Sequence, residues 1–139
     1  MKTGHCLCGA VTFRGDVASE IQACHCVQCQ RWTGGGPLYA VRIKNIELSG
    51  EAEVRAYHHS AHGERANCRV CGSVLYWKMQ GEGITFVAPG LLDDQSGMSL
   101  TEEIFIDGRP DWMAPVPGAV QRTEAEMQAE LQTYLERKA

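Results

Sequence analysis

The sequence predicts a mainly β protein that ends in one α-helix. Short runs rich in β-branched and aromatic residues recur along the chain, and Gly, Asn, Asp or Pro bounds them. Glycine is frequent, at 15 of 139 residues, which suits many turns. Near the C-terminal end of the chain, apolar residues recur with the spacing of an α-helix over a long stretch. A length of 139 residues is that of one domain, and we expect a single domain over 1–139.

The strands are expected at six short runs. In residues 38–43, apolar and polar positions partly alternate, as in a half-buried strand. The preceding residues 34–37 read Gly-Gly-Gly-Pro, which predicts a loop, because three glycines and a proline destabilise any regular element. The six runs are residues 10–13, 38–43, 54–57, 74–77, 84–88 and 104–106.

The last stretch predicts a helix over about 124–137. Thr123 and Glu126 have the spacing of a capping box. Four apolar residues fall on one face of this helix, which we expect to pack against the sheet. The alternative is that this face forms the contact of a homodimer. The four residues are Met127, Leu131, Tyr134 and Leu135.

Charge and hydropathy argue against several classes of protein. The formal net charge is -4, and the chain has no run of Lys and Arg that would suit nucleic acid or an acidic membrane. No apolar run is long enough to span a membrane, and the N-terminus lacks the apolar stretch of a signal peptide. We therefore expect a cytoplasmic protein, in which clustered cysteines stay reduced and more often bind metal than form disulfides.

The seven cysteines fall into three groups. Cys6 and Cys8 are followed by Gly9, and Cys68 and Cys71 are followed by a glycine as well. Two thiolates from one tight turn can occupy two corners of a zinc tetrahedron, and a following glycine lets backbone amides approach the sulfur. The two pairs are therefore matched halves of one closed, structural site.

The remaining group, Cys24, Cys26 and Cys29, offers three ligands within six residues. Three protein ligands with one open position are typical of a catalytic zinc. Other interpretations stay open at this point: disulfides with one cysteine left over, a redox dithiol, or a closed site completed by His25 or by a more distant histidine. His58, His59 and His62 form the loop cluster that could supply such a ligand.

The pattern resembles the glutathione-dependent formaldehyde-activating enzyme family (the centromere protein V/GFA type). The resemblance covers residues 4 to about 113, with all seven cysteines in register. Its segments are 4–13 (GHCLCGAVTF), 24–31 (CHCVQCQR) with Gly34, 68–76 (CRVCGSVLY), 88–94 (APGLLDD) and 104–112 (IFIDGRPDW).

The resemblance implies an Mss4-like fold of short antiparallel sheets around a structural zinc. By motif position, Cys6, Cys8, Cys68 and Cys71 would hold that zinc, and Cys24, Cys26 and Cys29 would hold a catalytic one. Two Zn²⁺ per chain are therefore expected, with glutathione as a possible co-substrate. The implied reaction adds a thiol to a small aldehyde, or cleaves a carbon–sulfur bond in the reverse direction.

Further candidates surround this site. Trp32, Gly34 and Trp112, with Tyr39, are candidates for a substrate pocket, although aromatic residues more often belong to a core. His25 is the imidazole nearest the three cysteines and could move a proton, but a hydrogen bond to a backbone carbonyl is the more frequent role.

The chain departs from the family pattern at two places. Asn67 replaces an aromatic residue, and Glu102-Glu103 stands where a histidine is usual, which would put negative charge near a segment facing the substrate. Two other functions stay open: a non-catalytic zinc module that binds a protein partner, and a zinc sensor.

Overall fold

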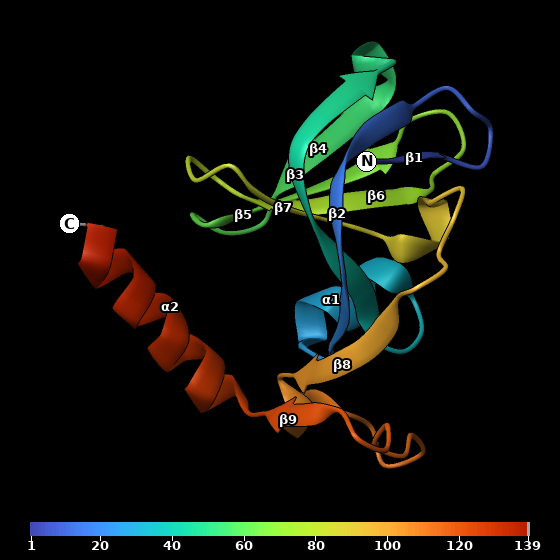
Figure 1. Ribbon diagram of the computed structural model, residues 1–139. Coiled ribbons are helices and arrows are strands. Elements are labelled where there is room, and N and C mark those ends of the chain that lie inside the picture. Colours follow the sequence, from blue (N-terminus) through green and yellow to red (C-terminus); the bar gives the residue numbers. More distant parts are fainter. Residues whose placement is uncertain (139) are drawn as a thin grey trace. The chain divides into compact units, whose positions relative to one another are not determined.

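The computed structural model describes residues 1–138 and is mainly β, as predicted (Figure 1). Two α-helices and three 3-10 helices join or follow the strands. The strands are β1 (Lys2–His5), β2 (Thr12–Cys24), β3 (Leu38–Ser49), β4 (Val54–His58), β5 (Gly63–Cys68), β6 (Val74–Met79), β7 (Ile84–Val87), β8 (Ser99–Ile104) and β9 (Val120–Arg122). The helices are α1 (Val27–Thr33), α2 (Glu124–Lys138), η1 (Glu51–Glu53), η2 (Pro89–Leu91) and η3 (Ile106–Gly108).

The chain folds into two compact units. The first contains Met1–Ile21 and Ala40–Ser99, and the second contains Gln22–Tyr39 and the chain from Leu100 onward. Strands β2 and β3 each begin in one unit and end in the other. Whether 1–139 behaves as one domain in solution stays a prediction. Neither α-helix has both the length and the apolar composition that a membrane span needs, within the described residues.

The first unit is a twisted sheet with strand order β4-β5-β6-β7-β3-β2, and β1 pairs with β2. The pairs β1–β2, β3–β7, β4–β5, β5–β6 and β6–β7 are antiparallel. Gly4 lies opposite Phe13, and a Cβ on this glycine would come within 2.5 Å of the Phe13 ring. The pairing of β1 therefore requires a residue without a side chain at position 4.

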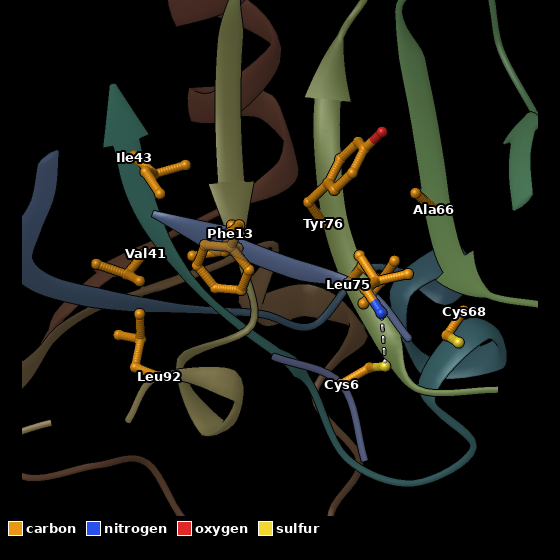
Figure 2. Close-up of a cluster of buried hydrophobic side chains, with 11 residues drawn as sticks. Cys6, Phe13, Val41, Ile43, Ala66, Cys68, Leu75, Tyr76 and Leu92 are labelled. Carbon is orange, nitrogen blue, oxygen red and sulfur yellow. Dashed lines mark hydrogen bonds between the residues drawn. The ribbon is translucent and has the colours of Figure 1, made fainter. Parts of the chain in front are cut away.

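The core of the first unit includes two of the cysteines. Val11, Val41 and Val87 are at most 1% exposed, and each fully buried side chain of this size contributes about 1.5–3 kcal/mol. Cys6 and Cys68 are 0% exposed and belong to the same apolar cluster (Figure 2). The cysteine cluster of this unit is therefore continuous with its core. The complete cluster is Cys6, Val11, Phe13, Val41, Ile43, Ala66, Cys68, Leu75, Tyr76, Val87 and Leu92.

The second unit contains the end of β2, α1, the start of β3, β8, β9 and α2. Strand β9 pairs with β8 in parallel, which places Gln121 opposite Glu103. The interior of this unit includes two polar side chains that are fully buried, His25 and Glu103. Burial of such groups is costly unless they are hydrogen-bonded. The other buried residues of this unit are Ala23, Cys24, Cys29, Pro37, Leu38 and Ile104.

The six predicted runs all overlap strands, with errors at the ends of three of them. Ala88 lies beyond β7, which ends at Val87. Residues 10 and 11 precede β2, because they belong to the turn around the first cysteine pair. Strand β8 ends at Ile104, and Phe105 adopts a left-handed φ of 54°, which stops the strand. Strands β1, β5 and β9 and helix α1 were not predicted. Strand β5 reads Gly-Glu-Arg-Ala-Asn-Cys, which has no apolar alternation to reveal it.

The C-terminal helix is confirmed, and so is its capping box. Thr123 Oγ1 accepts a hydrogen bond from Glu126 N at 3.2 Å, and Glu126 Oε1 accepts one from Thr123 N at 3.1 Å. No residue of α2 is buried, and the predicted apolar face is half-exposed. Packing of this face against the sheet and its alternative, a dimer contact, both stay predictions.

Candidate metal centres

The first unit brings four thiols together. Cys6 and Cys8 follow β1, Cys68 ends β5 and Cys71 lies in the turn after it. Their Sγ atoms all lie within 4.8 Å of one another. The Sγ–Sγ distances are 3.6 Å between Cys6 and Cys8 and 3.8 Å between Cys8 and Cys68. With Zn–S bonds of about 2.3 Å, a tetrahedron has edges of about 3.8 Å, so these four residues fit a zinc ion.

Two similar turns present these thiols. Gly9 and Gly72 have φ of 80° and 79°, the left-handed region that favours glycine. Gly9 N donates to Cys6 O at 3.1 Å, and Gly72 N donates to Cys68 O at 2.8 Å. The glycines after the two cysteine pairs therefore make the tight turns that the sequence predicted.

Hydrogen bonds to sulfur stabilise the thiolate forms in this cluster. Val11 N donates to Cys6 Sγ at 3.4 Å, and Ala10 N to Cys8 Sγ at 3.5 Å. The Ser73 hydroxyl lies 3.2 Å from Cys71 Sγ and, with its own backbone, holds the pKa of Cys71 at about 5. Ser73 was missed in the sequence, although it directly follows the second cysteine pair and its glycine.

Four sulfurs this close cannot all be thiolates without a cation between them. The backbone N–H of Ala10 lowers the pKa of Cys8, but burial and the neighbouring thiols outweigh it and raise this pKa to about 12. A bound cation reverses this balance, because coordinated thiols are deprotonated. The donor set, its spacing and its N–H···S bonds all suit a metal ion.

The second unit holds the three remaining thiols. Cys24 ends β2, Cys26 is the N-cap of α1 and Cys29 lies in that helix. Their Sγ atoms also lie within 4.8 Å of one another. Cys29 N donates to Cys26 Sγ at 3.3 Å, which fixes the spacing within the helical turn. Cys24 and Cys29 are buried and Cys26 is half-exposed.

No fourth ligand from the second unit joins these thiols, as far as residue 138. A His, Asp or Glu side chain from this unit within the same 4.8 Å would complete the cluster, and none lies there. Cys26 and Cys29 are also the main cause of a strongly raised pKa of Cys24, with its burial adding to it. The cluster can therefore hold a cation with three thiolates and leave one position for a ligand.

His25 points into the interior of the second unit. It is 0% exposed, and its Nε2 lies 2.8 Å from Glu103 Oε1. The partner is thus a carboxylate, where a backbone carbonyl was the more frequent expectation. Glu103 is also 0% exposed and lies within β8. The charge of Glu103 is therefore enclosed by donors and does not face solvent. Whether Glu102-Glu103 puts negative charge near a segment facing the substrate stays a prediction.

The remaining candidates are a histidine considered as a fourth metal ligand and the residues expected to line a substrate pocket. His58 Nε2 lies 2.9 Å from Glu64 Oε1 in the first unit, so this histidine has a carboxylate partner there. Trp32 lies on α1 and is half-buried, and Gly34 caps that helix at φ 84°. Trp112 is 76% exposed and Tyr39 is 43% exposed. A substrate pocket formed by Trp32, Gly34 and Trp112 stays a prediction.

Gln30 and Gly108 both contact the backbone carbonyl of His25, which lies within the three-cysteine segment. Gln30 Nε2 donates to His25 O and to Gly108 O, both at 2.7 Å. A Cβ on Gly108 would lie 2.4 Å from His25 O, closer than real contacts allow. The carbonyl between two of the cysteines therefore lies directly against this glycine. Neither residue was singled out in the sequence, although Gln30 lies in the family segment 24–31 and Gly108 in the segment 104–112.

We expect Gly108→Ala to weaken the second unit. The added methyl must displace the His25 carbonyl, and overpacking of this kind costs about 1–3 kcal/mol. Gly90→Ala is the matched control, because Gly90 also lies in a 3-10 helix and its Cβ would meet nothing within 4 Å. Urea unfolding of the two metal-loaded variants measures the difference. Equal unfolding midpoints would contradict this account of Gly108.

Comparison with known proteins gives a consistent result. The model of the family described as "Glutathione-dependent formaldehyde-activating enzyme" matches residues 1–108. A protein of Schizosaccharomyces pombe, described as an uncharacterized lyase, is 26% identical over 110 residues, which cover 78% of this chain and 80% of that protein. A crystal structure of a Rhodobacter sphaeroides protein is similar in fold, with a TM-score of 0.57 and 17% identity, over 87% of this chain and 99% of that one. The family match spans both cysteine clusters, and the chain therefore belongs to the glutathione-dependent formaldehyde-activating enzyme family.

Proposed function

We propose that this chain is a zinc-dependent carbon–sulfur lyase-type enzyme. It adds a thiol such as glutathione to a small aldehyde, or catalyses the reverse cleavage, in the cytoplasm. The observation that carries the proposal is the cluster of three thiols in the second unit, with no fourth ligand from that unit among the described residues. The family's name and the lyase named as a relative support the same class of reaction.

We propose a structural role for the four-cysteine cluster and a catalytic role for the three-cysteine cluster. The four thiols of the first unit can fill a tetrahedron, and two of them, Cys6 and Cys68, belong to its core, as suits a structural metal site. Cys24, Cys26 and Cys29 would hold the catalytic ion. They lie in a unit that also buries the polar pair His25 and Glu103, and Cys26 keeps part of its surface in solvent. The second site is therefore the better candidate for exchange of a ligand.

The reaction needs a sulfur nucleophile at neutral pH. Zinc held by the three cysteines would supply it, because a bound cation lowers the pKa of a ligand thiol. In the addition, the substrate sulfur bonds to the carbonyl carbon and the thiol proton ends on the carbonyl oxygen. No oxidant or reductant is required. The protein's contribution is to fix the three thiolates, which the N–H of Cys29 and the buried position of Cys24 help to do.

The test is thiol binding to the metal-loaded protein. We expect glutathione or another small thiol to bind one equivalent per chain by calorimetry, because the three-cysteine site offers one vacant position. S-methylglutathione is the matched ligand control, since it lacks a free thiol and should not bind in the same way.

Metal analysis completes this test. Two zinc ions per fully loaded chain are expected. A single zinc per chain, or two zinc ions with no uptake of any thiol in a panel, would overturn the enzyme proposal. The second of these results would leave a non-catalytic zinc module that serves a protein partner.

A further inference from the structure

Glu103 is the centre of a hydrogen-bond network in the second unit, and its side chain and that of His25 are fully buried. Its Oε1 lies 2.8 Å from His25 Nε2. Its Oε2 accepts hydrogen bonds from Val116 N at 2.8 Å, from Gln121 Nε2 at 2.8 Å and from Arg109 Nη1 at 3.3 Å. Four donors around one carboxylate are the number that an ionised carboxyl can accept.

The network keeps Glu103 charged. Burial alone would raise the pKa of this carboxyl, but the hydrogen bonds from Gln121, Val116 and His25 and the charge of Arg109 outweigh burial and lower the pKa to about 2. Arg109 is itself 15% exposed and also donates to Gln121 Oε1 at 2.7 Å. An ionised carboxylate only accepts hydrogen bonds, so the proton in the contact with His25 lies on Nε2.

His25 connects this network to the metal-binding segment. It stands between Cys24 and Cys26, and its backbone is fixed on both sides. His25 N donates to Ile104 O at 3.0 Å, and His25 O accepts from Gln30 Nε2 at 2.7 Å. The ring is held from one side: Nδ1 is buried and has no hydrogen-bond partner among residues 1–138. Glu103 is therefore the side chain that sets the orientation of the ring.

We propose that Glu103 is a positioning residue of the three-cysteine centre. Glu103 accepts a hydrogen bond from His25 Nε2–H and so fixes His25, which lies between two of the cysteines. The spacing of Cys24 and Cys26 is thereby set before a metal binds. This inference rests on the proposed function only in taking the three cysteines as a metal site. It is independent of which thiol or aldehyde reacts there.

The alternative is that Glu103 only stabilises the unit as a whole. It bridges β8 to Gln121 on β9 and to the loop at Val116, and loss of such a buried partner is destabilising in general. The two roles differ in what they predict for metal binding. If Glu103 positions the cysteines, its loss should lower the affinity for the second metal equivalent only. If Glu103 only stabilises the unit, its loss should lower the stability of the fold, as should the loss of any other member of the network.

The test compares Glu103→Gln with Glu102→Gln. Glu102 precedes Glu103 in β8, is 29% exposed and forms an ion pair with Arg122 at 3.4 Å, so its substitution makes the same chemical change outside the network. Each full-length variant is titrated with Co²⁺, whose thiolate absorption reports ligand geometry, and zinc affinity is measured by competition with a chelator.

We expect the first metal equivalent to bind Glu103→Gln as it binds the unmodified protein. The second equivalent should bind about 10–100-fold more weakly, as is typical when a group that orients a metal site is removed, and its Co²⁺ spectrum should change. Glu102→Gln should show neither effect. Equal weakening of both equivalents, or no change in the second, would overturn the proposal.

A second variant covers the case in which Glu103→Gln does not fold. His25→Ala leaves Glu103 with three donors and removes the link to the cysteines, so it should give the same selective loss of the second equivalent. If Glu103 acts through His25, the double variant should lose no more affinity than His25→Ala alone. Additive losses would contradict this route.

These results are distinct from those that test the enzyme. If the unmodified protein binds two metal ions and no thiol, the proposed function fails while the selective effect of Glu103→Gln can still be observed. If thiol binds and Glu103→Gln leaves the second site unchanged, the positioning role fails alone.

Discussion

Replacing Cys68 by serine is expected to unfold the first unit and release its metal. Cys68 is 0% exposed, belongs to the apolar cluster and lies 3.8 Å from Cys8 Sγ. Structural zinc sites contribute about 10–16 kcal/mol in small domains, whereas net stability is about 5–15 kcal/mol. Loss of one ligand therefore removes a contribution as large as the stability itself. Circular dichroism and metal analysis of the purified variant measure both effects.

A result that would contradict this prediction is a folded Cys68→Ser protein with two metal ions. It would mean that the first unit keeps both its fold and its metal without the Cys68 thiolate. Removal of zinc from the unmodified protein by a strong chelator should reproduce the loss of structure, because the same centre is emptied. The spectra before and after chelation provide that comparison.

Replacing Cys26 by serine is expected to abolish activity and release one metal ion while the fold survives. Cys26 is half-exposed, caps α1 and lies outside the apolar cluster of the first unit. Two thiols and a serine hydroxyl hold zinc poorly, because neutral hydroxyls are weak ligands beside thiolates. The first unit keeps its four thiols and its core. The chemical change is the same as in Cys68→Ser, so each variant is the control for the other.

The measurements are metal content, thermal unfolding and thiol uptake. We expect one zinc ion per chain, an unfolding midpoint close to that of the unmodified protein, and no thiol binding. Unfolding of Cys26→Ser with loss of both metal ions would show that the two centres do not have separate roles. Retention of both ions with normal thiol uptake would remove Cys26 from the proposed site.

Local patterns in the sequence predicted much of this protein. The spacing of Cys6 and Cys8, with a glycine after them, matched that of Cys68 and Cys71, and the structure brings these four thiols together. The grouping of Cys24, Cys26 and Cys29 was visible because the three lie within six residues. The C-terminal helix was predicted from Thr123 and Glu126, since capping is a contact between residues three apart.

Only the tertiary structure decided the surroundings of Glu103. Its partner His25 lies 78 residues away in the sequence, and Gln121 and Val116 approach it because β9 pairs with β8. From the sequence, Glu102-Glu103 was expected only to put negative charge near a segment facing the substrate. Burial of Glu103 had no local signal, because a carboxylate is rarely buried unless it is paired. A local sequence pattern indicates contacts between residues that are close together along the chain. A buried ionic network depends on which distant segments meet, and that is determined when the whole chain packs.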